Sequence, residues 1–171
     1  MADELVARTE VPEIKEPVLA VVSPHAGYPY SGPVAAYSYA VLKGRKFACV
    51  VVISPSHFEG FSFASVYQGD AYATSPGNIP VDKLFAAQLA ESNPLIKLST
   101  RGHGHVEGRG EHSLEVELPF LERVLRNFKL VPIVMGEQSY ATSRAGGCCF
   151  GQTHPRRSTT FFAGLRHSHC G

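Results

Sequence analysis

The sequence lacks the segments that would carry it into or across a membrane. None of its apolar runs approaches the roughly 20 residues that a membrane-spanning helix needs. The first residues do not combine a positively charged stretch with an apolar one, so we expect no secretory signal peptide. These features predict a cytoplasmic protein with no membrane partner.

The sequence also lacks a disulfide framework, although it holds four cysteines. Cys49 stands alone in an apolar run, and the other three, Cys148, Cys149 and Cys170, lie near the C-terminal end. In a disulfide-bonded extracellular domain, the cysteines would be spread through the chain. This distribution indicates a reducing compartment.

Charge is scarce as well. Charged residues make up 18% of the chain and the net charge is +1, so no overall field favours nucleic acid as a partner. No Walker loop, GxGxxG loop or GxSxG elbow occurs, which leaves nucleotide binding and serine hydrolysis without support. With 171 residues, the chain is of a length typical of one domain.

The first 143 residues alternate between strand-like and helix-like segments. Valine-rich runs predict buried strands over residues 18–22, 49–53 and 130–135. Pro132 indicates that the third strand lies at an edge or carries a bulge. A shorter pair of strands is expected over residues 63–67 and 70–74, on either side of Gln68 and Gly69.

Apolar residues at helical spacing predict three helices, over residues 33–43, 81–92 and 113–127. In the first, Val34, Tyr37 and Val41 share the helical spacing. In the second, Leu84, Ala87 and Leu89 are expected to face inward.

The third predicted helix contains Pro119, which should either kink it or mark its true start, and Ser113 is the expected N-cap. Strand, helix and strand in succession indicate an α/β fold with a mostly parallel sheet flanked by helices.

Residues 144–171 have a different composition. They contain no Val, Ile, Lys, Asp, Glu, Met or Tyr, and no helical or strand period continues. We favour an atypical tail that is translated out of frame or disordered, after an α/β domain over residues 1–143. An ordinary irregular tail is a second interpretation. A metal-binding tail is a third, with the ligand types Cys148, Cys149, His154, His167, His169 and Cys170, although no standard metal-ligand spacing is present.

Two histidines follow two of the predicted strands. His25 comes after residues 18–22 in the segment SPHAG, and His57 after residues 49–53 in the segment SPSHFEG. If the two strands are neighbours, both imidazoles project from the same edge of the sheet. They could then be two nitrogen ligands of one metal ion, or an acid and its partner. Alternatively, each histidine caps its own loop through a backbone carbonyl.

Other polar residues are candidates for the same pocket. Glu111 and His112 precede the third predicted helix, where they could be aimed into a pocket or could simply form its polar entry. Tyr28 and Tyr30 follow His25 and could offer hydroxyls to a ligand or pack the loop. In the Gly-rich segment RGHGHVEGRG, His103 and His105 are expected to be surface residues.

The segments SPHAGYPYSG, VVISPSHFEG and EHSLEVELPFL, in this order, resemble the Memo family, which in prokaryotes is the Memo component of the AmmeMemoRadiSam system. The resemblance implies a fold shared with LigB-type class III extradiol dioxygenases, whose non-haem iron is held by two histidines and a carboxylate. It implies His25 and His57 as ligands of Fe(II) or copper, and His112 as a pocket-lining, candidate catalytic residue. The family's cysteine ligand and its Ser-Asp-x-x-His segment have no match here, and family members are longer, so the fold is expected to be incomplete.

Three functions remain open on this basis. The first is a metal-dependent redox protein that acts on a small molecule bound beside His25 and His57. The second is a non-catalytic adaptor on the same scaffold, with a peptide in the pocket, because the resemblance also includes animal Memo, which engages phosphotyrosine peptides. The third is an inactive, truncated fragment.

Overall fold

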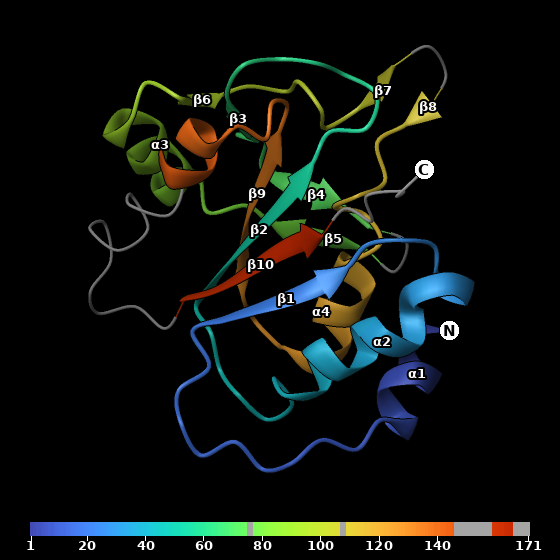
Figure 1. Ribbon diagram of the computed structural model, residues 1–171. Coiled ribbons are helices and arrows are strands. Elements are labelled where there is room, and N and C mark those ends of the chain that lie inside the picture. Colours follow the sequence, from blue (N-terminus) through green and yellow to red (C-terminus); the bar gives the residue numbers. More distant parts are fainter. Residues whose placement is uncertain (75–76, 107–108, 146–158, 166–171) are drawn as a thin grey trace.

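The computed structural model describes residues 1–74, 77–106, 109–145 and 159–165. A six-stranded sheet in the order β1-β10-β2-β9-β3-β6 forms its centre (Figure 1). Its strands are β1 (Ala20–Pro24), β2 (Cys49–Pro55), β3 (Ala64–Val66), β6 (Ile96–Leu98), β9 (Lys129–Met135) and β10 (Thr159–Leu165). All neighbouring strands are parallel except β3 and β9. The predicted α/β class with a mostly parallel sheet is confirmed.

Helices cover both faces of this sheet (Figure 1). One face carries α1 (Ala2–Arg8), α2 (Tyr28–Ala40) and α4 (Leu118–Val124), and the other carries α3 (Lys83–Ser92). Residues 140–145 are also helical. None of the helices in the described ranges is long and apolar enough to cross a membrane.

Strands β2 and β9 carry long apolar runs because both of their faces are buried. Val50 and Val52 of β2 pack into the core under α2 and α4, and Val51 packs into the core under α3. In β9, Leu130 packs into the core under α2 and α4, and Val131 packs into the core under α3. Successive side chains of a strand point to opposite faces, so a sheet with two covered faces needs unbroken apolar runs.

Two expectations about the sheet were wrong, those for Pro132 and for the segments around Gln68, and one condition set for the two histidines is not met. Strands β1 and β2 are not neighbours, because β10 lies between them. Pro132 lies in an interior strand without a bulge. Its carbonyl accepts a hydrogen bond from the Tyr67 N–H, one residue past the end of β3. The β3–β9 ladder has ended at that point, so no strand partner requires the N–H that proline lacks. The segments around Gln68 do not pair with each other. Instead, β3 pairs with β6 and β9, and β4 (Ala71–Ala73) pairs with β5 (Asn78–Pro80).

The helices also differ from their predicted bounds. Helix α2 begins at Tyr28, with a proline in its first turn, and buries Ala35 and Ala36 while Val34 and Tyr37 are exposed. Small residues let this helix approach the sheet closely, and Val41, the third residue of the predicted spacing, is only partly buried.

The second predicted helix is α3, which buries Phe85, Ala86 and Leu89 and leaves Leu84 exposed. Its N-cap is Asp82, whose carboxylate accepts the Phe85 N–H at 3.2 Å.

Pro119 marks the true start of the third predicted helix. Residues 113–117 form turns, and α4 begins at Leu118 with the proline in its first turn. Ser113 is therefore not an N-cap; its hydroxyl donates instead to the Pro55 carbonyl at 2.6 Å. Four leucines of this segment are nevertheless buried: Leu114, Leu118, Leu121 and Leu125.

Candidate functional site

His25 and His57 meet at the carboxyl edge of the sheet. His25 directly follows the last residue of β1, and His57 lies two residues beyond β2. Although β10 separates the two strands, the two Nε2 atoms are 3.3 Å apart and the ring centroids are 5.2 Å apart. His25 is buried, and the side chain of His57 is 23% exposed. The structure thus brings the two predicted ligands into direct contact.

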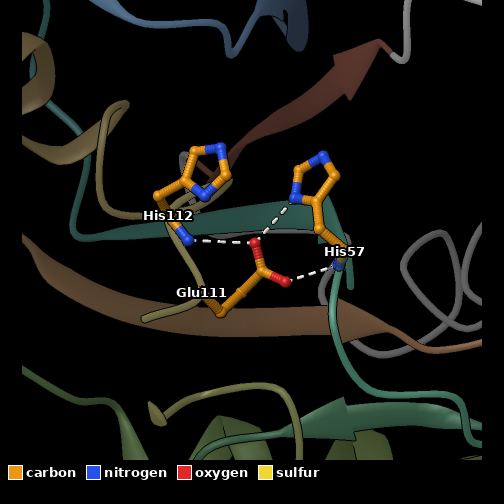
Figure 2. Close-up of side chains that lie close together, drawn as sticks. All are labelled: His57, Glu111 and His112. Carbon is orange, nitrogen blue, oxygen red and sulfur yellow. Dashed lines mark hydrogen bonds and ion pairs between the residues drawn. The ribbon is translucent and has the colours of Figure 1, made fainter. Parts of the chain in front are cut away.

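Glu111 contacts the Nδ1 side of the His57 ring, whereas His25 faces the Nε2 side. Figure 2 shows the contact with Glu111. One carboxylate oxygen, Oε1, lies 2.8 Å from His57 Nδ1 and also accepts the backbone N–H groups of His112 and Ser113, at 2.9 and 3.0 Å. The other, Oε2, accepts the His57 backbone N–H. The hydroxyl of Ser113 anchors this segment to the end of β2 through Pro55. Both oxygens of Glu111 are therefore occupied by hydrogen bonds.

These hydrogen bonds determine the charge of Glu111. Its side chain is 5% exposed, and burial alone would raise its pKa. The backbone and ring N–H groups of His57 and the Ser113 backbone N–H outweigh burial and hold the pKa of Glu111 below its usual value. The residue is therefore an ionised carboxylate near neutral pH.

An ionised Glu111 determines which nitrogen of His57 carries the proton. A carboxylate accepts hydrogen bonds only, so His57 Nδ1 is the donor in this contact. In a neutral imidazole, Nε2 is then the atom with the lone pair. That atom is the one directed at His25.

His112 lies on the exposed side of the site. Its ring stacks on that of His57, with centroids 4.9 Å apart and planes 10° apart. Figure 2 shows His112 and His57 on either side of the Glu111 carboxylate. Ligand atoms of these three residues lie within 4.8 Å of one another, so they form an alternative metal-binding cluster. The oxygens of Glu111 already accept four hydrogen bonds. This cluster is therefore a poorer metal site than the two Nε2 atoms of His25 and His57, which face each other.

The two predicted tyrosines lie away from the histidines. The hydroxyl of Tyr28 donates to the Val116 carbonyl at 3.2 Å, and its ring meets Phe120 edge-on. Burial and the charges of two nearby glutamates raise the pKa of Tyr28 to about 12. Tyr30 is 86% exposed.

His103 is not the surface residue that we expected. It is partly buried, and its Nε2 lies 3.0 Å from the Ser65 carbonyl. His105 lies in β7 (His105–Val106), which pairs with β8 (Arg109–Gly110).

The cysteines and histidines of the proposed metal-binding tail lie outside the described residues, and the idea of an out-of-frame tail stays a prediction. Part of that tail forms β10, in the middle of the sheet.

Sequence reasoning missed two polar groupings. One consists of Tyr39 and Glu117, whose side chains are hydrogen-bonded in the core. The other consists of Tyr67, Tyr72 and His103, which contact one another through their rings. Tyr39 and Glu117 are 78 positions apart, and His103 is 31 positions from Tyr72, so only the folded chain brings these residues together.

Comparison with known proteins places these features in context. A family model described as "Memo-like protein" matches residues 2–170. A MEMO1 family protein of Nitrosopumilus maritimus is 30% identical over 155 residues, which cover 90% of this chain and 54% of that protein. MEMO1 family proteins of Methanobrevibacter smithii and Saccharolobus solfataricus are 38% and 39% identical, over 72% and 69% of this chain and 42% and 40% of their own lengths. The chain spans about half the length of these curated relatives.

Proposed function

The chain belongs to the Memo family, and we propose that it binds a transition-metal ion between the Nε2 atoms of His25 and His57. The observation that carries this proposal is the 3.3 Å separation of the two nitrogens. Two imidazole nitrogens that bind one tetrahedral ion at roughly 2.0–2.1 Å lie about 3.3 Å apart. The two ligand atoms are thus already spaced for a shared ion.

Glu111 supports the same proposal. A metal-bound histidine commonly donates its other ring N–H to a carboxylate, which fixes the ring and raises its basicity. Glu111 makes this contact with His57 Nδ1 and is itself fixed by backbone N–H groups. Glu111 is accordingly a positioning residue that keeps the His57 lone pair directed at the ion.

The chemistry of the donor set suits a redox-active metal. Imidazole nitrogen is a good ligand for iron and copper, and a bound Fe(II) or copper ion would supply electron-transfer or oxygen chemistry at this edge of the sheet. The buried ring of His25 shields one side from water, and the exposed ring of His112 lies on the open side. A small molecule or peptide bound there would contact His112, which we propose as the candidate catalytic residue.

A second candidate function is a binding module without catalysis. It is favoured by Glu111, because its oxygens are engaged by four N–H groups and are not available to an ion. In that case His112 and its surroundings would receive a peptide without any chemical step.

Metal binding itself can be tested by calorimetric titration of the full-length chain with Co(II) or Cu(II). We expect one ion per chain, and loss of most of the affinity in H25A and in H57A. E111Q should weaken binding by about 10- to 100-fold, the range typical of a lost partner of a metal-bound histidine. H112A is the matched control and should bind as the wild type does.

The same titrations can contradict the proposal. Loss of binding in H112A with retention in H25A would place the ion in the alternative cluster of His57, Glu111 and His112. Circular dichroism of each variant shows whether a loss of metal binding comes from a lost ligand residue or from loss of the fold. If the chain binds no metal but still binds peptide, the second candidate function is correct.

A further inference from the structure

A cavity of about 260 Å³ lies beside Glu111 and is separate from the paired histidines. Its walls include the rings of Tyr67, Tyr72 and His103, and the carboxylate residues Glu111 and Glu115. Drug-sized ligands occupy pockets of about 300–1,000 Å³, so this cavity fits a small head group. The proposed metal site does not use it.

The three rings pack against one another at different angles and form one aromatic part of the wall. Tyr67 and Tyr72 meet at 81° with centroids 5.2 Å apart, and Tyr72 and His103 at 76° with centroids 5.9 Å apart. Tyr67 and His103 are tilted by 48° at 5.4 Å. The face of an aromatic ring carries partial negative charge. A cluster of aromatic rings in the wall of a small cavity is a common feature of sites that recognise ammonium groups.

His103 belongs to this cavity as a neutral ring. The Ser65 carbonyl can only accept, so His103 Nε2 is the donor in their 3.0 Å contact. His103 Nδ1 then accepts from the Tyr72 hydroxyl at 3.4 Å. Burial, partly offset by the Ser65 carbonyl and Glu111, lowers the pKa of His103 to about 4. The cavity thus gains an aromatic wall without a positive charge.

The charges around the cavity have one sign. Glu111 and Glu115 line it, and among the described residues of its wall none is Lys or Arg. Burial, the charge of Glu115, the neighbouring Tyr67 and the charge of Glu111 all raise the pKa of Tyr72. Both polar atoms of His103 and the proton of the Tyr72 hydroxyl are already used in hydrogen bonds. An anion would therefore meet carboxylates and few donors, whereas a cation would meet ring faces and negative charge.

We propose that this cavity binds the head group of a small organic ammonium cation. The cluster of Tyr67, Tyr72 and His103 would contact one side of the alkylated nitrogen, and the exposed carboxylate of Glu115 would supply the balancing charge. The proposal does not depend on a bound metal, because none of the three rings belongs to the proposed metal site.

Choline and its neutral isostere 3,3-dimethylbutan-1-ol test this proposal, because they have nearly the same shape and differ in charge. Calorimetry, or NMR of the ¹⁵N-labelled full-length chain without added metal, should detect choline with shifts at Tyr72 and His103. Binding of the alcohol should be at least about tenfold weaker, as expected when cation–π attraction is removed. Equal binding of both compounds would overturn the proposal.

Variants test whether the ring faces and charges hold the ligand. Y72L keeps apolar bulk without a ring and should weaken choline binding by about tenfold, whereas Y72F keeps the ring and should bind within about twofold of the wild type. E115Q, at an exposed position, should weaken binding by about threefold, as for a partly solvated charge pair.

Two exposed positions outside the cavity serve as controls. Y140L, which removes a tyrosine that is 79% exposed, and E91Q should leave choline binding unchanged. A thermal melt of each variant identifies any that is unfolded. Choline affinity that is the same in folded Y72L as in the wild type would refute the aromatic site.

Discussion

Replacing Glu117 with glutamine should change how the stability of the protein depends on pH. Glu117 is 2% exposed and accepts a hydrogen bond from the Tyr39 hydroxyl, and the ring of Tyr39 stacks on Phe120 at 4.9 Å. Burial raises the pKa of Glu117 from 4.5 to about 7, although hydrogen bonds from Tyr39 and Ser23 favour the ionised form. The helix predicted over residues 113–127 would contain this residue, but in the structure it is the buried N-cap residue of α4.

The raised pKa predicts a loss of stability with rising pH. Between pH 4.5 and about 7, the folded chain keeps a proton on Glu117 that the unfolded chain has released. The stability contribution is thus complete below pH 4.5 and is lost as the pH rises through about 7. At about 1.4 kcal/mol per pKa unit, this shift corresponds to about 3 kcal/mol.

His103 acts in the opposite direction over a similar range. Its pKa falls from 6.5 to about 4 on folding, so its contribution is complete above pH 6.5 and is lost as the pH falls through about 4. The wild-type profile therefore combines two opposing slopes. A comparison of the wild type with E117Q isolates the glutamate, because His103 is present in both proteins.

Urea unfolding at intervals from pH 4 to pH 8 is the appropriate measurement. Relative to the wild type, E117Q should gain about 3 kcal/mol in the free energy of unfolding between pH 4.5 and pH 8. E91Q, at an exposed position, serves as the control and should show a nearly constant difference. A difference between the wild type and E117Q that does not vary with pH would refute the buried, proton-binding role of Glu117.

Two further substitutions test local features of the fold. G136A should destabilise the protein by about 1–3 kcal/mol, since an added Cβ would lie 2.3 Å from the Phe61 carbonyl oxygen; G60A, with open space around its Cβ, should have little effect in the same thermal melts. Equal melting temperatures for the two variants would contradict this close approach. D82A should cost about 1 kcal/mol through loss of the α3 N-cap, and unchanged urea unfolding would show that the cap contributes nothing.

The strand-end histidines were predictable because their position follows from local sequence. Valine-rich runs that end in Ser-Pro and lead to His25 and His57 identify two parallel strands and place both residues at one edge of the sheet. The order of the strands was not predictable in this way. Strand β10 enters between β1 and β2 from a segment whose composition showed no strand period, and its place is determined by pairing across the fold.

Contacts between distant segments account for the rest of what the sequence did not reveal. Glu117 and Tyr39 are 78 positions apart, and nothing in the helix that was predicted over residues 113–127 distinguished Glu117 from Glu115. Glu111 was a candidate pocket residue, but its role in fixing His57 became visible only through four hydrogen bonds in the folded chain. Pro119 was the most informative local signal there, because it correctly marked the start of α4.

The most direct test of the proposed function is a crystal structure of the full-length chain grown with Co(II), with anomalous scattering measured at the metal edge. The proposal predicts one strong anomalous peak between His25 and His57, at roughly 2.0–2.1 Å from each Nε2 atom, with Glu111 still bonded to His57 Nδ1. A peak bound by Glu111 and His112 instead, or no peak near His25, would contradict it.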